Sequence, residues 1–394
     1  MAGSAEANHV EEGFGVLGTN EPNSQRCAGG RLVTRRAFVV SAASLGAAAG
    51  SLLAGCAGNA RSSSIGQQAD ESFANDLAAR SERAGISNNP NLSSAPLEQK
   101  DAAGNSDDPN RLIARLALIS DTHLSWEFEP SVPHMRSALQ ALSAFDPKPD
   151  AIIINGDVTN HGQPEEYDLV EQLAGEAGFK FPDSFICTMG NHEQRGYRDD
   201  ASPESFQEQR DLFMQRCNLG KLYYDLDVNG VHLVMLGPDA DPQSWKTVRY
   251  SKEQLEWLDG LLESDAREGK PAFVFSHQPA SDTVIHTYEG EYAHDALESS
   301  AELLSVVQKY RNAVLVTAHT HSPADFYRPN DDGPLFVCDS AVAYLRNDPY
   351  LDWADDAPNY SRGVLADVYA NRIEFLSWDF MLGAEADTGS YTLT

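Results

Sequence analysis

The sequence predicts an α/β fold in which mixed β-sheets are flanked by helices, and three features indicate it. From residue 111 onward, apolar runs rich in β-branched residues alternate with stretches of helical spacing. Continuous apolar runs are typical of strands that are buried on both faces. A strand–helix–strand–helix–strand order favours parallel strands joined by helical crossovers, whereas a later Asn-Gly dipeptide indicates a hairpin.

The first half of the folded part contains five predicted elements. Arg111–Ser120 is an apolar strand, and Ser131–Phe145 has the spacing of a helix. Ala151–Asn155 is a short strand that leads into a Gly-Asp pair. Pro164–Gly178 is a helix with Glu in its first turn, which suits the helix dipole. Ser184–Met189 is a third strand, so this half is expected to form a parallel sheet.

The second half is expected to be more antiparallel. Strands at Tyr223–Val228 and Val231–Leu236 flank Asn229-Gly230 and predict a hairpin. Ser251–Gln254 resembles a capping box that opens a helix through Glu263. The remaining expected elements are strands at Ala272–Phe275, Ala313–Thr317 and Leu335–Cys338, a helix around Leu297–Tyr310 and a hairpin around Asn371.

The composition excludes several classes of function. The 394 residues carry a formal net charge of -30, with 22% charged and 41% hydrophobic residues. This balance suits a folded protein with a sizeable core, and so acidic a surface opposes binding of nucleic acid. Five cysteines without a CxxC pair exclude a disulfide-dense scaffold and a zinc ribbon. The sequence contains neither a GxSxG motif nor a P-loop motif, so it does not indicate a serine hydrolase or an NTPase.

The N-terminal 55 residues have the pattern of an export signal. Arg31, Arg35 and Arg36 precede the uncharged stretch Ala37–Gly55, and a basic flank before an apolar segment is typical of such signals. The arginine pair Arg35-Arg36, with Phe38 two residues later, resembles a twin-arginine signal that the matching export machinery would recognise.

The uncharged stretch ends in a Leu-Ala-Gly-Cys sequence that resembles a bacterial lipobox, in which Cys56 would be lipidated after cleavage. An uncleaved membrane-spanning helix or a cytosolic helix of small residues are the alternatives. Residues 56–110 are rich in Ser, Asn and Ala and predict a disordered tether. We therefore expect a signal over 1–55, a tether over 56–110 and a catalytic domain over 111–394, anchored at the extracytoplasmic face of a bacterial membrane.

Polar side chains follow five of the predicted strands at the point where each strand ends. In open α/β sheets, sites form outside the carboxyl ends of strands, so these side chains are expected to meet. His, Asp and Asn suit Zn, Fe or Mn, and their number favours two ions. Two ions would clamp the attacking and leaving oxygens of a displacement, which is phosphoester chemistry. The residues concerned are Asp121, His123, Asp157, Asn191, His192, His277, His319 and His321.

These motifs together resemble the calcineurin-like metallophosphoesterase family, over roughly residues 113–325. The resemblance implies a four-layer α/β/β/α sandwich and a bridging hydroxide between two ions. It implies that His192 protonates the leaving group and that Asp157 bridges the ions, one on each carboxylate oxygen. It assigns Asp121, His123 and His321 to the first ion, and Asn191, His277 and His319 to the second.

Three positions depart from the patterns of the family, and two of them narrow the branch. Ala318 replaces the Gly that usually opens the last motif, a small change. Asn160 stands where purple acid phosphatases carry a Tyr, and His161 stands where protein phosphatases carry an Arg. The segment Gly156–Tyr167 looks more like the phosphodiesterase and purple-phosphatase-like branch.

The substrate is expected to be a small phosphate ester. Arg195, Arg198 and His161 could bind it, with surface residues as the alternative. His286 and Tyr288 could also line the pocket, although ordinary loop positions are the simpler interpretation. The alternative to an enzyme is a non-catalytic, metal-containing binding protein on the same scaffold. No disulfide can be assigned among Cys187, Cys217 and Cys338.

Overall fold

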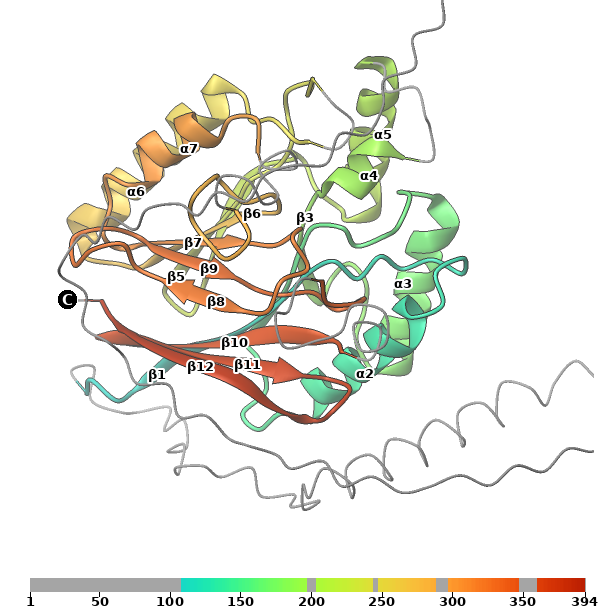
Figure 1. The fold of residues 1–394 in the computed structure, drawn as a ribbon, viewed down its shortest axis with the longest axis horizontal. Helices are drawn as coiled ribbons and strands as arrows, with labels where there is room; N and C mark the ends of the chain where they lie inside the picture. Colours follow the sequence, from blue (N-terminus) through green and yellow to red (C-terminus); the bar gives the residue numbers. More distant parts are fainter. Residues whose placement is uncertain (1–107, 197–202, 244–246, 288–296, 347–359, 394) are drawn as a thin grey trace, which may run out of the picture. The chain divides into compact units, whose positions relative to one another are not determined.

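The computed structural model describes residues 108–196, 203–243, 247–287, 297–346 and 360–393. Within this part, two six-stranded sheets pack face to face between helices (Figure 1). The predicted export signal with Arg35 and Arg36, the lipidation site Cys56 and almost all of the tether lie outside the described residues. No helix in the described ranges is long and apolar enough to cross a membrane.

The first sheet places the ends of three strands side by side. β1 lies at its centre, parallel to β2 on one side and antiparallel to β10 on the other. Ile119 at the end of β1 pairs with Ile154, and Ile154 pairs with Cys187 of β3, so the polar residues after these strands emerge at one level. In sheet order the strands are β12 (Ala384–Thr392), β11 (Arg372–Asp379), β10 (Arg362–Tyr369), β1 (Leu112–Ile119), β2 (Ala151–Asn155) and β3 (Phe185–Thr188).

The second half of the chain is more antiparallel than the first, as expected, although the centre of the second sheet is parallel. Its four central strands run parallel, and only the edge strands β4 and β8 are antiparallel to their neighbours. The helices α6 (Lys252–Glu268) and α7 (Ser300–Val307) act as crossovers between β5, β6 and β7, whereas β8 lies between β7 and β9 in the chain. The order is β4 (Tyr224–Val228), β5 (Val231–Met235), β6 (Ala272–Ser276), β7 (Ala313–Thr317), β9 (Leu335–Cys338) and β8 (Asp325–Tyr327).

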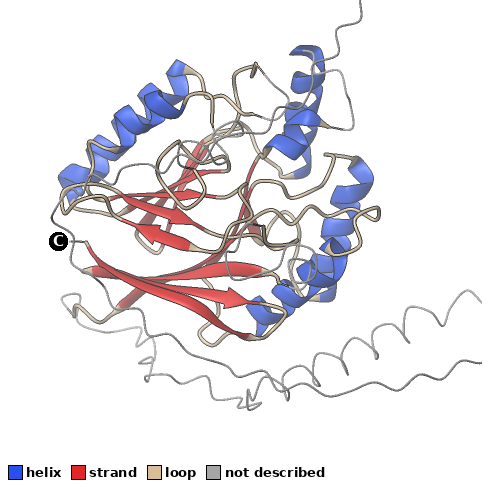
Figure 2. Cartoon of the chain, viewed as in Figure 1, coloured by secondary structure: helices blue, strands red, loops and turns tan. Residues whose placement is uncertain are grey.

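Three apolar clusters hold the layers together, and Figure 2 shows the helices on the outer faces of the two sheets. One cluster joins the first sheet to its helices, and a second, including Leu118 and Phe275, fills the space between the sheets. A third packs Leu258 and Val307 onto the second sheet. The four-layer α/β/β/α prediction is confirmed. The helices are α2 (Ser131–Ala144), α3 (Pro164–Glu176), α4 (Asn191–Arg195), α5 (Pro203–Arg216), α6 (Lys252–Glu268) and α7 (Ser300–Val307).

Some elements differ from the sequence prediction. α6 begins as expected, because Ser251 accepts a hydrogen bond from the Gln254 amide, but it continues to Glu268 and ends at Gly269. Gly269 adopts the left-handed conformation, with a φ of 67°, which is the usual helix stop. α4, α5, β8 and β12 were not predicted, and β12 is a largely exposed edge strand without an apolar run.

Candidate metal centre

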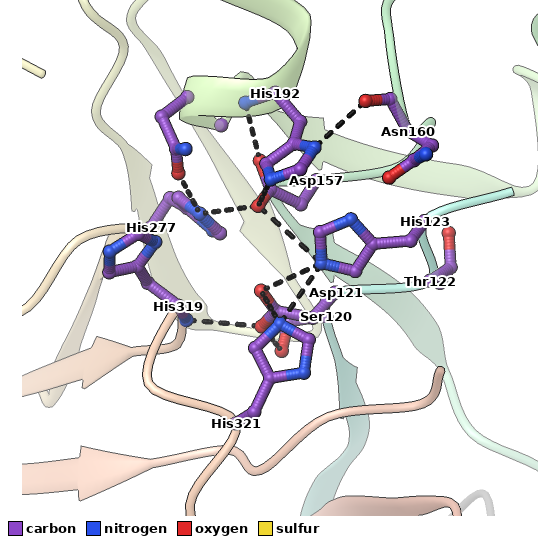
Figure 3. A network of polar contacts seen from close by, with 12 residues as sticks. Ser120, Asp121, Thr122, His123, Asp157, Asn160, His192, His277, His319 and His321 are labelled. Atoms are coloured by element: carbon purple, nitrogen blue, oxygen red, sulfur yellow. Dashed lines mark hydrogen bonds and ion pairs between the residues drawn. The ribbon is translucent and has the colours of Figure 1, made fainter. Parts of the chain in front are cut away.

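The ends of strands from both sheets converge on one cluster of ligand-type side chains (Figure 3). β1, β2 and β3 contribute from the first sheet, and β6 and β7 contribute from the second. All seven predicted ligands and the predicted acid His192 are described, and their side chains lie within a continuous set of short contacts. The seven are Asp121, His123, Asp157, Asn191, His277, His319 and His321.

The first group consists of Asp121, His123 and His321. The Nε2 atoms of the two imidazoles lie 3.0 Å apart. Asp121 Oδ1 lies 3.3 Å from His321 Nε2 and 3.7 Å from His123 Nε2. The other oxygen, Oδ2, accepts hydrogen bonds from the Ser120 hydroxyl and from the His319 amide. One carboxylate oxygen therefore faces the two ring nitrogens while the other fixes its orientation.

The second group surrounds His277, whose ring is fully buried. Its Nε2 lies 3.2 Å from Asp157 Oδ2 and 3.1 Å from Asn191 Oδ1. The His319 ring packs against the His277 ring, with centroids 5.3 Å apart. Asp157, His277 and His319 together have the spacing of a metal-binding group.

Asp157 lies between the two groups. Its Oδ2 is 3.2 Å from His277 Nε2 and 3.7 Å from His123 Nε2. Its Oδ1 instead accepts the amide hydrogen of His192 at 2.9 Å. The sequence led us to expect one oxygen for each ion, whereas in the structure a single oxygen faces both groups.

Close backbone packing makes this arrangement possible. Five of the seven ligand-type residues have positive φ, between 43° and 67°, a conformation that non-glycine residues rarely adopt. At Gly156 (φ 83°) a Cβ would lie 2.4 Å from the His277 ring. At Gly190 it would lie 2.1 Å from Asp157 Oδ1. Both glycines are needed because the ligand side chains occupy the space of a methyl group.

Backbone carbonyls orient the histidine rings. The Nδ1 atoms of His277, His321 and His192 lie 2.8, 2.9 and 2.8 Å from the carbonyls of Asn155, Tyr344 and Asn160. A proton on Nδ1 satisfies each carbonyl and directs Nε2 into the site. Fixing one ring nitrogen in this way leaves the other as a metal ligand or proton carrier.

The buried carboxylates give the centre a strongly negative potential. Burial raises the pKa of Asp121 and Asp157, but the imidazoles of His321 and His277 outweigh it and hold both pKa values below the usual range. Burial lowers the pKa of His277, yet Asp157 and Asp121 raise it to about 10. A proton on His277 thus occupies the region where a metal cation would balance the same charge.

The other properties of the donors fit metal ions. Asp121 Oδ1 is buried and accepts no hydrogen bond in the described structure. Burial and His192 lower the pKa of His123 to about 4, and burial and His277 lower that of His319 to about 3. Both rings are therefore neutral at physiological pH, which is the form that binds metals.

Glu193 is a supporting residue to which the sequence analysis gave no role. Its buried carboxylate accepts amide hydrogen bonds from Thr159 at 2.7 Å, Gly190 at 2.9 Å and Asp157 at 3.1 Å. It thereby ties the turn after β2 to the turn after β3. Burial and the Asp157 carboxylate raise its pKa to about 8. Its position directly after the Gly-Asn-His motif was the feature of the sequence that could have indicated this role.

The predicted substrate-binding residues have mixed outcomes. Arg198 and Tyr288 lie outside the described residues. Arg195 is half-buried in the last turn of α4. His286 lies 2.9 Å from the Ser322 hydroxyl. His161 contacts Glu166 at 2.9 Å.

His161 also lines a hollow of about 290 Å3, together with Ser125, Trp126 and Glu127. Ser125 is two residues from His123, and His161 follows the Asn160 carbonyl that orients His192. The hollow therefore borders two chain segments that also carry residues of the centre. The three described cysteines, Cys187, Cys217 and Cys338, are buried and free.

Comparison with known proteins finds relatives that are named as phosphodiesterases and phosphatases. Glycerophosphodiester phosphodiesterase GpdQ of Enterobacter lignolyticus is 24% identical over 253 residues, covering 60% of this chain and 82% of that protein. Probable purple acid phosphatase 20 of Arabidopsis thaliana is 26% identical over 220 residues, covering 51% and 47%. The chain therefore spans most of the first relative and about half of the second.

Solved structures agree on the fold. A dimetal phosphatase from Danio rerio superposes with a TM-score of 0.54 at 13% identity, covering 72% of this chain and 100% of that chain. A purple acid phosphatase from yellow lupin gives a TM-score of 0.50 at 12% identity, covering 71% and 53%. The family model for calcineurin-like phosphoesterases matches residues 114–323, more than half of the chain. The chain belongs to the calcineurin-like phosphoesterase family.

Proposed function

We propose that this protein hydrolyses small phosphodiesters with the help of two metal ions. The observation that carries the proposal is the position of Asp157 Oδ2 between two groups of buried ligands, with His192 beside it. Asp121, His123 and His321 would hold one ion, and Asn191, His277 and His319 the other, with Asp157 shared. Fe, Mn and Zn all suit these N and O donors.

The ions would supply Lewis acidity toward the phosphoryl oxygens and lower the pKa of water for attack. The protein contributes orientation and a proton. His192 Nε2 lies 4.0 Å from Asp157 Oδ2, while its Nδ1 is held by the Asn160 carbonyl. The ring is half-exposed and edge-on to His123, with centroids 4.4 Å apart. From this position a proton on Nε2 can pass to the leaving alkoxide.

Two observations support a small diester as substrate. The relative that is named a glycerophosphodiester phosphodiesterase aligns along most of its length, and Asn160 replaces the Tyr of purple acid phosphatases. The net charge of -30 disfavours a nucleic-acid substrate. Arg195, Arg198 and His161 remain the proposed contacts to the ester.

The test is hydrolysis of paired chromogenic phosphate monoesters and diesters by the full chain with added Mn2+, Zn2+ or Fe2+. Turnover that requires metal, favours the diester and falls at least about 100-fold in Asp157→Asn and His192→Ala supports the proposal. Faster turnover of the monoester would contradict the preference for diesters and indicate a phosphomonoesterase. Metal binding without turnover of either ester would contradict the proposal and favour a binding protein.

We also propose that the protein is exported by the twin-arginine machinery and anchored to the membrane by a lipid on Cys56. The support is the sequence pattern around Arg35, Arg36 and Cys56. Replacing both arginines with Lys should block export, and Cys56→Ser should abolish incorporation of labelled fatty acid. Export of the arginine variant, or labelling of the Cys56 variant, would contradict the corresponding half of this proposal.

A further inference from the structure

Asp339 is a fully buried carboxylate directly behind the metal centre, at the end of β9. In the described part of the chain it has no ion-pair partner and instead contacts two neutral side chains. Its Oδ1 lies 3.0 Å from the Ser120 hydroxyl, and its Oδ2 lies 3.3 Å from Asn155 Nδ2. An unpaired buried carboxylate is costly, so its presence here calls for a physical explanation.

On one side, Asp339 reaches the first ligand group through Ser120. The Ser120 hydroxyl lies 2.7 Å from Asp121 Oδ2 and 3.0 Å from Asp339 Oδ1. The Ser340 carbonyl also lies 3.0 Å from this hydroxyl. A hydroxyl has a single hydrogen, so it cannot donate fully to both carboxylates. If it donates to Asp121, a protonated Asp339 can donate to the Ser120 oxygen. Burial and the Asp121 charge raise the pKa of Asp339 well above its usual range, in agreement with this assignment.

On the other side, Asp339 reaches the second group through Asn155. The Asn155 amide nitrogen donates to Asp339 Oδ2, and its oxygen accepts from the Thr188 hydroxyl at 3.0 Å. This pairing fixes the direction of the amide. The backbone carbonyl of Asn155 is the group that holds His277 Nδ1 at 2.8 Å. One buried side chain is thus linked, through one residue each, to a ligand of each group.

We propose that Asp339 is a positioning residue that holds Asp121 through Ser120 and His277 through Asn155, and so sets the metal affinity of both groups. This inference rests on the proposed function, because it requires that the two groups bind ions. In this arrangement Asp339 contacts the Ser120 hydroxyl through Oδ1 and accepts from the Asn155 amide through Oδ2. The amide of an asparagine has the same shape and the same two capabilities.

The test compares Asp339→Asn with Asp339→Ala in the full chain. Mn2+ binding is measured by equilibrium dialysis, and the thermal unfolding of the metal-free proteins is recorded alongside. We expect Asp339→Asn to bind Mn2+ within a few-fold of the parent. Loss of a group that orients ligands typically weakens metal binding about 10- to 100-fold, which is the effect expected for Asp339→Ala. Parent-like binding by Asp339→Ala, or an equal loss in Asp339→Asn, would overturn the proposal.

Ser120→Ala provides a second test in case Asp339→Ala does not fold. It removes the link from Asp339 to Asp121, together with a 3.0 Å contact to the Ser340 carbonyl, and it keeps the link through Asn155. It should therefore weaken the binding of one of the two Mn2+ ions and leave the binding of the other unchanged. Ser143→Ala is the matched control, because that exposed hydroxyl bonds only to the nearby Gln140 carbonyl. Equal weakening of both ions, or of neither, in Ser120→Ala would contradict the proposal. A parent protein that binds neither Mn2+ nor Zn2+ would refute the proposed function, and this inference with it.

Discussion

Replacing Gly190 with Ala should disable the metal centre by moving Asp157. A Cβ at this position would lie 2.1 Å from Asp157 Oδ1 and 2.4 Å from the Asp157 backbone nitrogen. A side chain can rotate away from a methyl group, but a backbone nitrogen cannot. Gly190 itself has a φ of -94°, which any residue can adopt, so the effect of the substitution is purely steric.

The size of the effect follows from these distances. Contacts of a Cβ below 3.0 Å essentially never occur, so Oδ1 must retreat by at least about 0.9 Å. Asp157 Oδ2 is the oxygen that faces both ligand groups, and it moves with the same carboxylate. A misplacement of about 1 Å in a catalytic arrangement costs on the order of 100-fold in rate. Crowding in the core should also destabilise the fold by about 1–3 kcal/mol.

The assay is diester hydrolysis at saturating Mn2+, combined with the Mn2+ content after dialysis and a urea unfolding curve. Gly175→Ala is the matched control, because no atom outside its own helical turn lies within 4 Å of a Cβ built at this exposed position in α3. It should leave activity unchanged and raise stability by up to about 1 kcal/mol, since Ala is the better helix former. Gly190→Ala with the activity and Mn2+ content of the parent would refute the steric reasoning.

Three further predictions concern stability. Leu258→Ala, in the core under α6, should cost about 2–5 kcal/mol in urea unfolding while the folded enzyme keeps its rate. For His232, burial lowers the pKa, but Asp265 and Asp225 raise it above 6.5; its stabilisation should be complete below about pH 6.5 and disappear as the pH rises through the raised pKa. His232→Gln should therefore lose stability at pH 5.5 and little above pH 9, and the reverse order would contradict the assignment. The parent should have a free energy of unfolding about 2.7 kcal/mol lower after chelation than in Mn2+ at 100 times its Kd. The same comparison for Asp157→Asn should give a much smaller difference, and calorimetry can check both.

Much of the fold could be predicted because its strands are marked locally. Ala151–Ile154 is a continuous apolar run, followed by Asn155 and a Gly-Asp pair, and the structure places β2 over Ala151–Asn155, as predicted. The rule that sites form at the carboxyl ends of strands then predicts that the ligand residues lie close together. It did so even though the strands belong to two different sheets.

The remaining features depend on tertiary contacts that leave no local pattern. β12 is polar and largely exposed, and it is a strand because it pairs with β11 along its whole length. Asp339 follows an apolar strand just as Asp121 does, and nothing in the sequence distinguishes a ligand from a residue behind the ligands. Which oxygen of Asp157 faces the site depends on the His192 amide, a contact between residues 35 positions apart.

Backbone hydrogen bonds between the turns help to set the geometry of the centre. The Asp121 amide donates to the Gly156 carbonyl at 3.1 Å, and the His123 amide donates to the Asp157 carbonyl at 3.0 Å, so the turns after β1 and β2 hold each other. Left-handed φ values at Asp121, His123 and Asp157 cost of order 1–3 kcal/mol each and persist only where the surroundings over-determine them. The two sheets supply that constraint. Because these contacts orient the ligands, a wrong side chain behind them should lower metal affinity before it lowers the stability of the fold.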